Sequence, residues 1–163
     1  MQLTIKLDDF SRRPIAIINW FKGCRAMIDT GALFPIWADT DERLLKVYPQ
    51  AELIQKNVYF SGFGGKTQGN LYRINFRLNE LTYIDMPIIV KEEPNLNCHM
   101  LLSATMFDGM TYEIDTRNKK LNINTNDNQS VRILRLSKDY HNNVSVYLAG
   151  TYDSIEAYEK SIN

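Results

Sequence analysis

A short acidic motif near the start of the sequence has the residue types that acid–base chemistry needs. Met27 and Ile28, both apolar, lead into Asp29, Thr30 and Gly31. A carboxylate at the end of a strand can take up or release a proton, and a glycine beside it lets the backbone come close and offer N–H groups. A given tripeptide arises by chance in roughly 3% of chains of this length at average composition. A polar turn between two strands would use the same residues, so the rest of the sequence has to decide.

Two further elements follow the acidic motif at suggestive spacing. Residues 61–65 read Ser-Gly-Phe-Gly-Gly between two alternating segments, which predicts an exposed hairpin over about residues 56–72 with a flexible glycine tip. Further along, Leu101 and Leu102 lead into residues 103–107, for which we expect one helical turn.

The three elements together resemble the retropepsins, the single-domain aspartic proteases of retroviruses and their bacterial relatives. That family has an apolar strand ending in Asp-Thr-Gly-Ala, then a glycine-rich flap hairpin, then an apolar pair leading into a short helix. The match covers roughly residues 12–124 and suggests a divergent member. The resemblance implies a small closed β-barrel and a homodimeric aspartic endopeptidase that acts on polypeptides without a metal or cofactor.

The resemblance also assigns roles to individual residues. It makes Asp29, Thr30 and Gly31 the catalytic residues. It places substrate-binding and flap positions at Ala32, Gly62, Phe63, Gly64 and Gly65, and a substrate pocket at Leu33 and Leu102.

Hydrolysis of a peptide by this chemistry needs two carboxylates. One activates water as a base and the other protonates the leaving amine, and two such groups about 3 Å apart share one proton because both cannot ionise together. The sequence contains one Asp-Thr-Gly, so the second Asp29 has to come from another copy of the chain across a two-fold interface. In such a dimer the Thr30 hydroxyls would lock the two loops together, and Phe63 would shield the site from water.

The sequence departs from the retroviral pattern around the predicted helical turn. Ser103 stands where the family usually has glycine, and Ala104 and Thr105 replace an arginine and the residue after it. Leu33 and Phe34 replace the acids that follow the motif, one of which pairs with that arginine. Both halves of the ion pair are missing together, so no buried charge is left without a partner.

Two other interpretations stay open. In the first, the chain is a non-catalytic barrel of the same type that acts as a protein-binding or dimerisation module. In the second, it is an unrelated small β-barrel in which Asp-Thr-Gly occurs by chance. A cysteine nucleophile with a histidine base is a minor alternative, because Cys24, Cys98, His99 and His141 show no motif spacing. The same four residues do not suggest a zinc site or a disulfide framework.

Composition excludes several classes of partner. The 163 residues include 19 basic and 19 acidic side chains, so a net charge of zero gives no basic surface for nucleic acid. The longest apolar run, residues 15–21, is too short to cross a membrane. Asp8 and Asp9 stand where a signal peptide would be apolar, which predicts a cytoplasmic protein.

Period-two alternation dominates the chain and predicts a mostly β fold with one or two short helices. One helix is expected over residues 39–47 and another after Ser154, and a strand over residues 81–90 is expected to be cut by Pro87. We expect residues 1–128 to form the barrel with its flap. We expect residues 129–163 to form a C-terminal extension packed on the same domain. This extension either builds the dimer interface, closes its own barrel or plugs the cleft.

Overall fold

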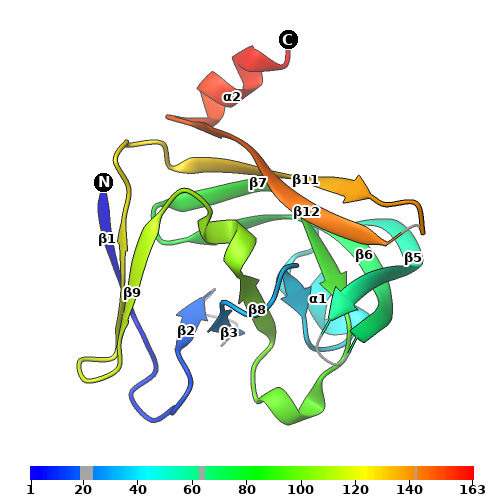
Figure 1. The fold of residues 1–163 in the computed structure, drawn as a ribbon, viewed down its shortest axis with the longest axis horizontal. Helices are drawn as coiled ribbons and strands as arrows, with labels where there is room; N and C mark the ends of the chain where they lie inside the picture. The colour runs from blue at the N-terminus through cyan, green and yellow to red at the C-terminus, as the bar shows by residue number, and fades with distance from the viewer. Residues whose placement is uncertain (19–23, 63–64, 142) are drawn as a thin grey trace.

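The computed structural model describes residues 1–18, 24–62, 65–141 and 143–163 (Figure 1). Its elements are mostly strands, as the sequence predicts. The strands are β1 (Gln2–Lys6), β2 (Ile15–Ile18), β3 (Cys24–Asp29), β4 (Ile36–Trp37), β5 (Glu52–Gly62), β6 (Gly65–Leu78), β7 (Leu81–Val90), β8 (Met100–Ser103), β9 (Thr111–Asp115), β10 (Lys120–Asn124), β11 (Val131–Lys138) and β12 (Val144–Tyr152). The helices are α1 (Asp41–Val47) and α2 (Ile155–Ser161), with short 3-10 turns η2 (Pro94–Leu96) and η3 (Ala104–Phe107). None of the helices in these ranges is long and apolar enough to cross a membrane.

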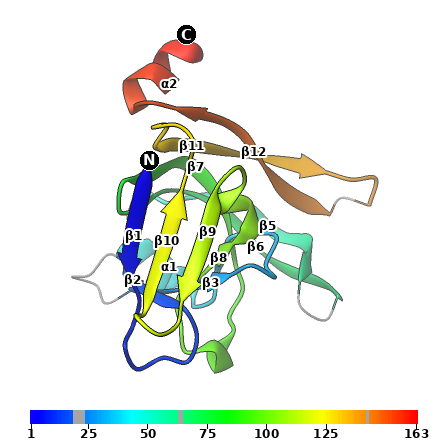
Figure 2. The same cartoon turned by 60° about the vertical axis from the view of Figure 1, so that its left-hand side comes forward.

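The strands form two sheets. The larger has the order β12-β11-β7-β4-β8-β3-β2, and the β5–β6 hairpin joins it where β6 pairs with β7. The smaller sheet, β1-β10-β9, stands beside it (Figure 2). Over the described residues the pairings follow an open path, so the closed barrel that the resemblance implies is not found. The first strand, β1, takes β10 as its ladder partner and meets the larger sheet through a bridge between Leu7 and Ala16.

The strand β8 lies between β3 and β4, although it comes from much later in the chain. It pairs in parallel with β3, from Ala26–Met100 to Asp29–Ser103, and antiparallel with β4. A parallel pair cannot be closed by a tight turn, and the connection from β3 to β8 runs through β4, α1, the β5–β6 hairpin and β7. The consequence is that the loop after Asp29 and the turn after Ser103 emerge at the same end of the sheet.

The β5–β6 hairpin is held at its base by close contact with β7. A Cβ atom at Gly69 would lie 2.4 Å from the Ile89 side chain and 2.6 Å from the Val90 carbonyl oxygen, so glycine is needed there. The expected break at Pro87 is wrong, because β7 runs unbroken from Leu81 to Val90. Pro87 lies between the stretch of β7 that pairs with β11 and the stretch that pairs with β4, so its missing N–H removes no ladder bond on that side.

The C-terminal strands belong to the same sheet as the rest. Val131 pairs in parallel with Thr82 of β7, and β11 carries β12 on its other side (Figure 2). Arg132 is buried, and its guanidinium donates to the carbonyl oxygens of Met106, at 3.0 Å, and Asp108. Tyr83 donates to the same Met106 oxygen at 2.7 Å. These bonds tie β11 and β7 to the η3 turn.

We predict that Arg132→Met lowers the free energy of unfolding by about 2–3 kcal/mol, because it removes charge-assisted bonds to buried carbonyl groups. The measurement is urea denaturation followed by circular dichroism. The matched control is Arg135→Met on the same strand, whose partly exposed side chain donates to Tyr158. Equal losses for the two variants would contradict the anchoring role of Arg132.

Candidate active site

Asp29 lies at the end of β3 in a tight turn. Its side chain is half-buried, and Oδ1 accepts a hydrogen bond from the Gly31 N–H at 3.0 Å. The Ala32 N–H donates to the Asp29 carbonyl oxygen at 3.1 Å. A Cβ on residue 31 would come within 3.3 Å of Oδ1, so glycine gives the carboxylate its room. Thr30, between the two, is exposed.

The loop after Asp29 is fastened to the η3 turn. The Ala104 N–H donates to the Ala32 carbonyl oxygen at 3.0 Å, and the Thr105 hydroxyl donates to the Leu33 carbonyl oxygen at 3.0 Å. Ala104 and Thr105 are the residues that depart from the retroviral pattern. Two neutral hydrogen bonds therefore hold the loop, and no ion pair is needed for this.

Residues on one face of the sheet lie next to the flap strand. Strand alternation puts Met27 on the face of Asp29, and Met27 shares an apolar cluster with Phe34 of the loop and with Val58 and Phe60 of β5. The Phe34 and Phe60 rings have centroids 6.3 Å apart. The cluster therefore brings the β5–β6 hairpin against the loop that carries the carboxylate. Phe34 and Phe60 were not among the predicted site residues, although both belong to apolar runs beside the motifs.

The other predicted site residues have different surroundings. Leu33, in the loop after Asp29, is 64% exposed. Leu102 is fully buried on the sheet face opposite to that of Asp29, in the core cluster that includes Ile28. Leu102 therefore does not line an open pocket in the single chain. Gly62 and Gly65 pair with each other at the end of the hairpin. Phe63 and Gly64 lie outside the described residues.

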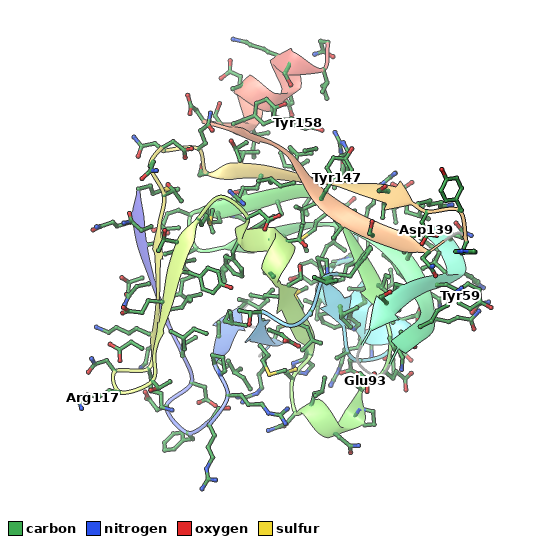
Figure 3. All side chains as sticks on the ribbon, viewed as in Figure 1. Tyr59, Glu93, Arg117, Asp139, Tyr147 and Tyr158 are labelled. Atoms are coloured by element: carbon green, nitrogen blue, oxygen red, sulfur yellow. The ribbon has the colours of Figure 1, made fainter. Side chains whose placement is uncertain are left out.

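The tip of the β11–β12 hairpin contacts the flap strand. Asn143 forms a parallel bridge with Tyr59 of β5, and Val144 is buried in the same apolar cluster as Phe60. The Asp139 carboxylate organises this tip by accepting from the backbone N–H groups of His141 and Asn143. Tyr59 and Asp139 lie on the same side of the molecule (Figure 3). The C-terminal extension thus supports the flap from one side.

The beginnings of β3 and β8 are joined by a histidine. His99 Nδ1 accepts from the Arg25 N–H at 3.0 Å, and the Arg25 side chain pairs with Asp8 at 3.1 Å. Burial lowers the pKa of His99, which keeps Nδ1 free to accept. These residues fix the far end of the two strands from Asp29.

Cysteine chemistry has little support in this structure. Burial raises the pKa of the Cys24 thiol to about 12, and burial also raises the pKa of Cys98. Both groups are therefore thiols at neutral pH, and a thiolate is the nucleophilic form.

Two depressions of the surface lie away from Asp29. A depression of about 220 Å³ lies at the other end of β3, beside Arg25 and His99, and a second one lies over β1, β9 and β10. Neither includes Asp29. Over the described part of the chain, no group of three or more histidine, cysteine, aspartate or glutamate side chains is arranged to hold a metal ion.

Comparison with family models, with curated proteins and with solved structures finds no match. The function therefore has to be argued from the site itself. Among the described residues, the hydrogen bond to the Asp29 carboxylate comes from its own loop, at Gly31. The geometry is that of one half-buried carboxylate at the end of β3. A single carboxylate can move one proton, which is half of what peptide hydrolysis needs.

We predict that acid weakens the fold through His99. Its pKa is lowered in the folded state, so below pH 6.5, its ordinary value, the unfolded chain binds the proton first and stability falls with falling pH. His99→Asn keeps an acceptor for the Arg25 N–H but cannot be protonated, so its unfolding free energy should change less between pH 7 and pH 5. Urea titrations across this range test it, with His141→Asn, at an exposed site, as the control. A wild-type fall that His99→Asn leaves intact would contradict the role of His99.

Proposed function

We propose that the chain is a homodimeric aspartic endopeptidase, with one Asp29 from each of two copies. The observation that carries the proposal is the turn of Asp29, Thr30 and Gly31 at the end of β3, with β8 inserted between β3 and β4. This insertion brings the Asp29 loop and the η3 turn together, and the flap strand lies against the same loop. On this view the larger sheet is a divergent, opened form of the retropepsin barrel.

The proposed reaction is a direct attack of water on the peptide carbonyl carbon. The ionised carboxylate of the pair takes a proton from the water, and the protonated one donates a hydrogen bond to the carbonyl oxygen. The tetrahedral intermediate then collapses, the C–N bond breaks, and the amine nitrogen leaves with a proton from the pair. Water is consumed, a carboxyl group and an amine are formed, and the pair returns to its single shared proton.

The remaining residues have supporting roles in this proposal. Thr30 is exposed and free to bond across the two-fold axis, and Ala32 and the flap residues at positions 62–65 would bind the peptide backbone. Leu33 projects from the loop, where it would meet substrate or the second copy. The substrate is a polypeptide, the reaction needs no cofactor or nucleic acid, and a cytoplasmic location remains a prediction.

A binding or dimerisation module without cleavage is the second candidate. It is favoured by the outer edge of β12, where Tyr147 is 50% exposed. Such a module would dimerise but would not depend on an ionisable group at position 29. The two experiments below separate the candidates.

We predict a two-fold dimer in solution. The site is incomplete in one chain, and a second copy brings the second carboxylate to hydrogen-bonding distance of the first. Sedimentation equilibrium over a wide concentration range should show a monomer–dimer exchange, with cleavage proportional to the dimer fraction. Full activity from a protein that stays monomeric would contradict the shared site.

We also predict that Asp29→Asn reduces peptide cleavage by roughly 10³-fold or more while the fold is kept, because the amide is nearly isosteric but cannot accept the proton of water. The assay is cleavage of a peptide library across pH. A matched acid-to-amide control is Asp85→Asn, at an exposed position of β7 where the register with β6 shifts and the backbone φ of 50° suits asparagine. An Asp29→Asn variant that cuts at the wild-type rate would show that Asp29 is not catalytic.

A further inference from the structure

Ser103, the last residue of β8, has a fully buried hydroxyl group. The residue is 0% exposed, and its Oγ has no hydrogen-bond partner among the residues that the structure describes. The hydroxyl does not cap the η3 turn that follows. Buried hydroxyls nearly always form hydrogen bonds, because leaving one unsatisfied costs stability. A serine at this position therefore carries a donor that forms no bond in the single chain and is available for another state of the protein.

The residue opposite Ser103 is Asp29. The two are register partners in the parallel ladder between β3 and β8, and neighbouring strands lie about 4.8 Å apart. Register partners project from the same face of a sheet, and two residues earlier Met27 and Leu101 share the apolar cluster on that face. At this spacing a serine hydroxyl can reach a carboxylate oxygen on the next strand with a change of side-chain rotamer.

We infer that Ser103 is a positioning residue, whose hydroxyl donates a hydrogen bond to the Asp29 carboxylate once the dimer has formed. The inference rests on the proposed function. In the single chain the carboxylate is half-buried and accepts from Gly31, and solvent reaches the rest of it. A second copy over the loop excludes that water, so the carboxylate then needs donors from the protein. Ser103 is a buried donor with no other use, on the neighbouring strand of the same chain.

The backbone of the site does not depend on this hydroxyl. Ala104 and Thr105 bond to the loop through a backbone N–H and a different side chain. Removing the Ser103 hydroxyl therefore leaves the loop fastened and changes the environment of the carboxylate. Removing the oxygen therefore distinguishes a Ser103 that only fills space in the fold from one whose hydroxyl positions the carboxylate.

The test is Ser103→Ala, measured for thermal unfolding, dimer dissociation and cleavage. In dilute monomer the variant should unfold about 2–4 °C higher, because an unsatisfied buried group is gone. In the dimer it loses a bond to a charged group, so the dissociation constant should rise and kcat should fall, each by about tenfold, with KM within about twofold of wild type. The matched control is Thr125→Val, just after β10, where the buried residue's hydroxyl donates to the Asp127 carbonyl oxygen. It should lower the melting temperature and leave kcat unchanged.

If Ser103 is a positioning residue, Ser103→Ala raises the melting temperature of the monomer and lowers kcat of the dimer. A Ser103→Ala variant that melts lower, as the control does, overturns the inference because the hydroxyl is then used in the single chain. A variant with unchanged kcat and unchanged dimer dissociation overturns it while the proposed function stands. If the wild type dimerises but cuts no peptide, the proposed function fails. The role of Ser103 is then tested only by comparing the dimer dissociation constants of the wild type and Ser103→Ala. A wild type that neither dimerises nor cuts overturns both.

Discussion

The parallel pairing of β3 with β8 is the contact on which the rest of the site depends. It brings together two segments more than seventy residues apart, and it ends at Asp29 and Ser103. Every feature of the candidate site is placed relative to that end: the Gly31 turn, the fastening of the loop to η3, and the Phe34 ring against Phe60. Without β8 beside β3, Asp29 would be only a polar residue at the end of a strand.

This arrangement holds the loop that carries the Asp29 carboxylate by contacts on several sides. The loop is held by short-range hydrogen bonds and by a dense apolar cluster on one sheet face. The carboxylate itself has few protein partners. In the proposed dimer, the second copy would act on this group in two ways, because it would supply the second carboxylate and remove water that weakens electrostatic interactions. A rigid loop also loses less conformational entropy when that partner binds.

The sequence predicted local features well and long-range pairings poorly. The helix at Thr40 follows from its capping hydroxyl, which accepts from the Arg43 N–H, and the turn at Asp29 follows from the glycine two residues later. Pro87 was wrongly read as a break, because its cost depends on which strand lies beside it and sequence spacing does not show that. Likewise the face of Leu102 depends on the register of β8 with β3. The open path of the sheet depends on the choice of β10 as the partner of β1.

The order of strands in the larger sheet also bears on how the chain is made. The strand β7 pairs with β4 and β6, which precede it, and with β11, which follows it, and Arg132 of β11 bonds to η3 beside Tyr83 of β7. A ribosome delivers the N-terminal segments first, and they meet their partners in β8 and β11 only after those have emerged. Such distant pairings close slowly because of the loop entropy that must be lost first. The nascent chain therefore contains β3 and the flap hairpin before β8 and β11 can pair, and the loop after Asp29 gains its hydrogen bonds only after Ala104 and Thr105 have been made.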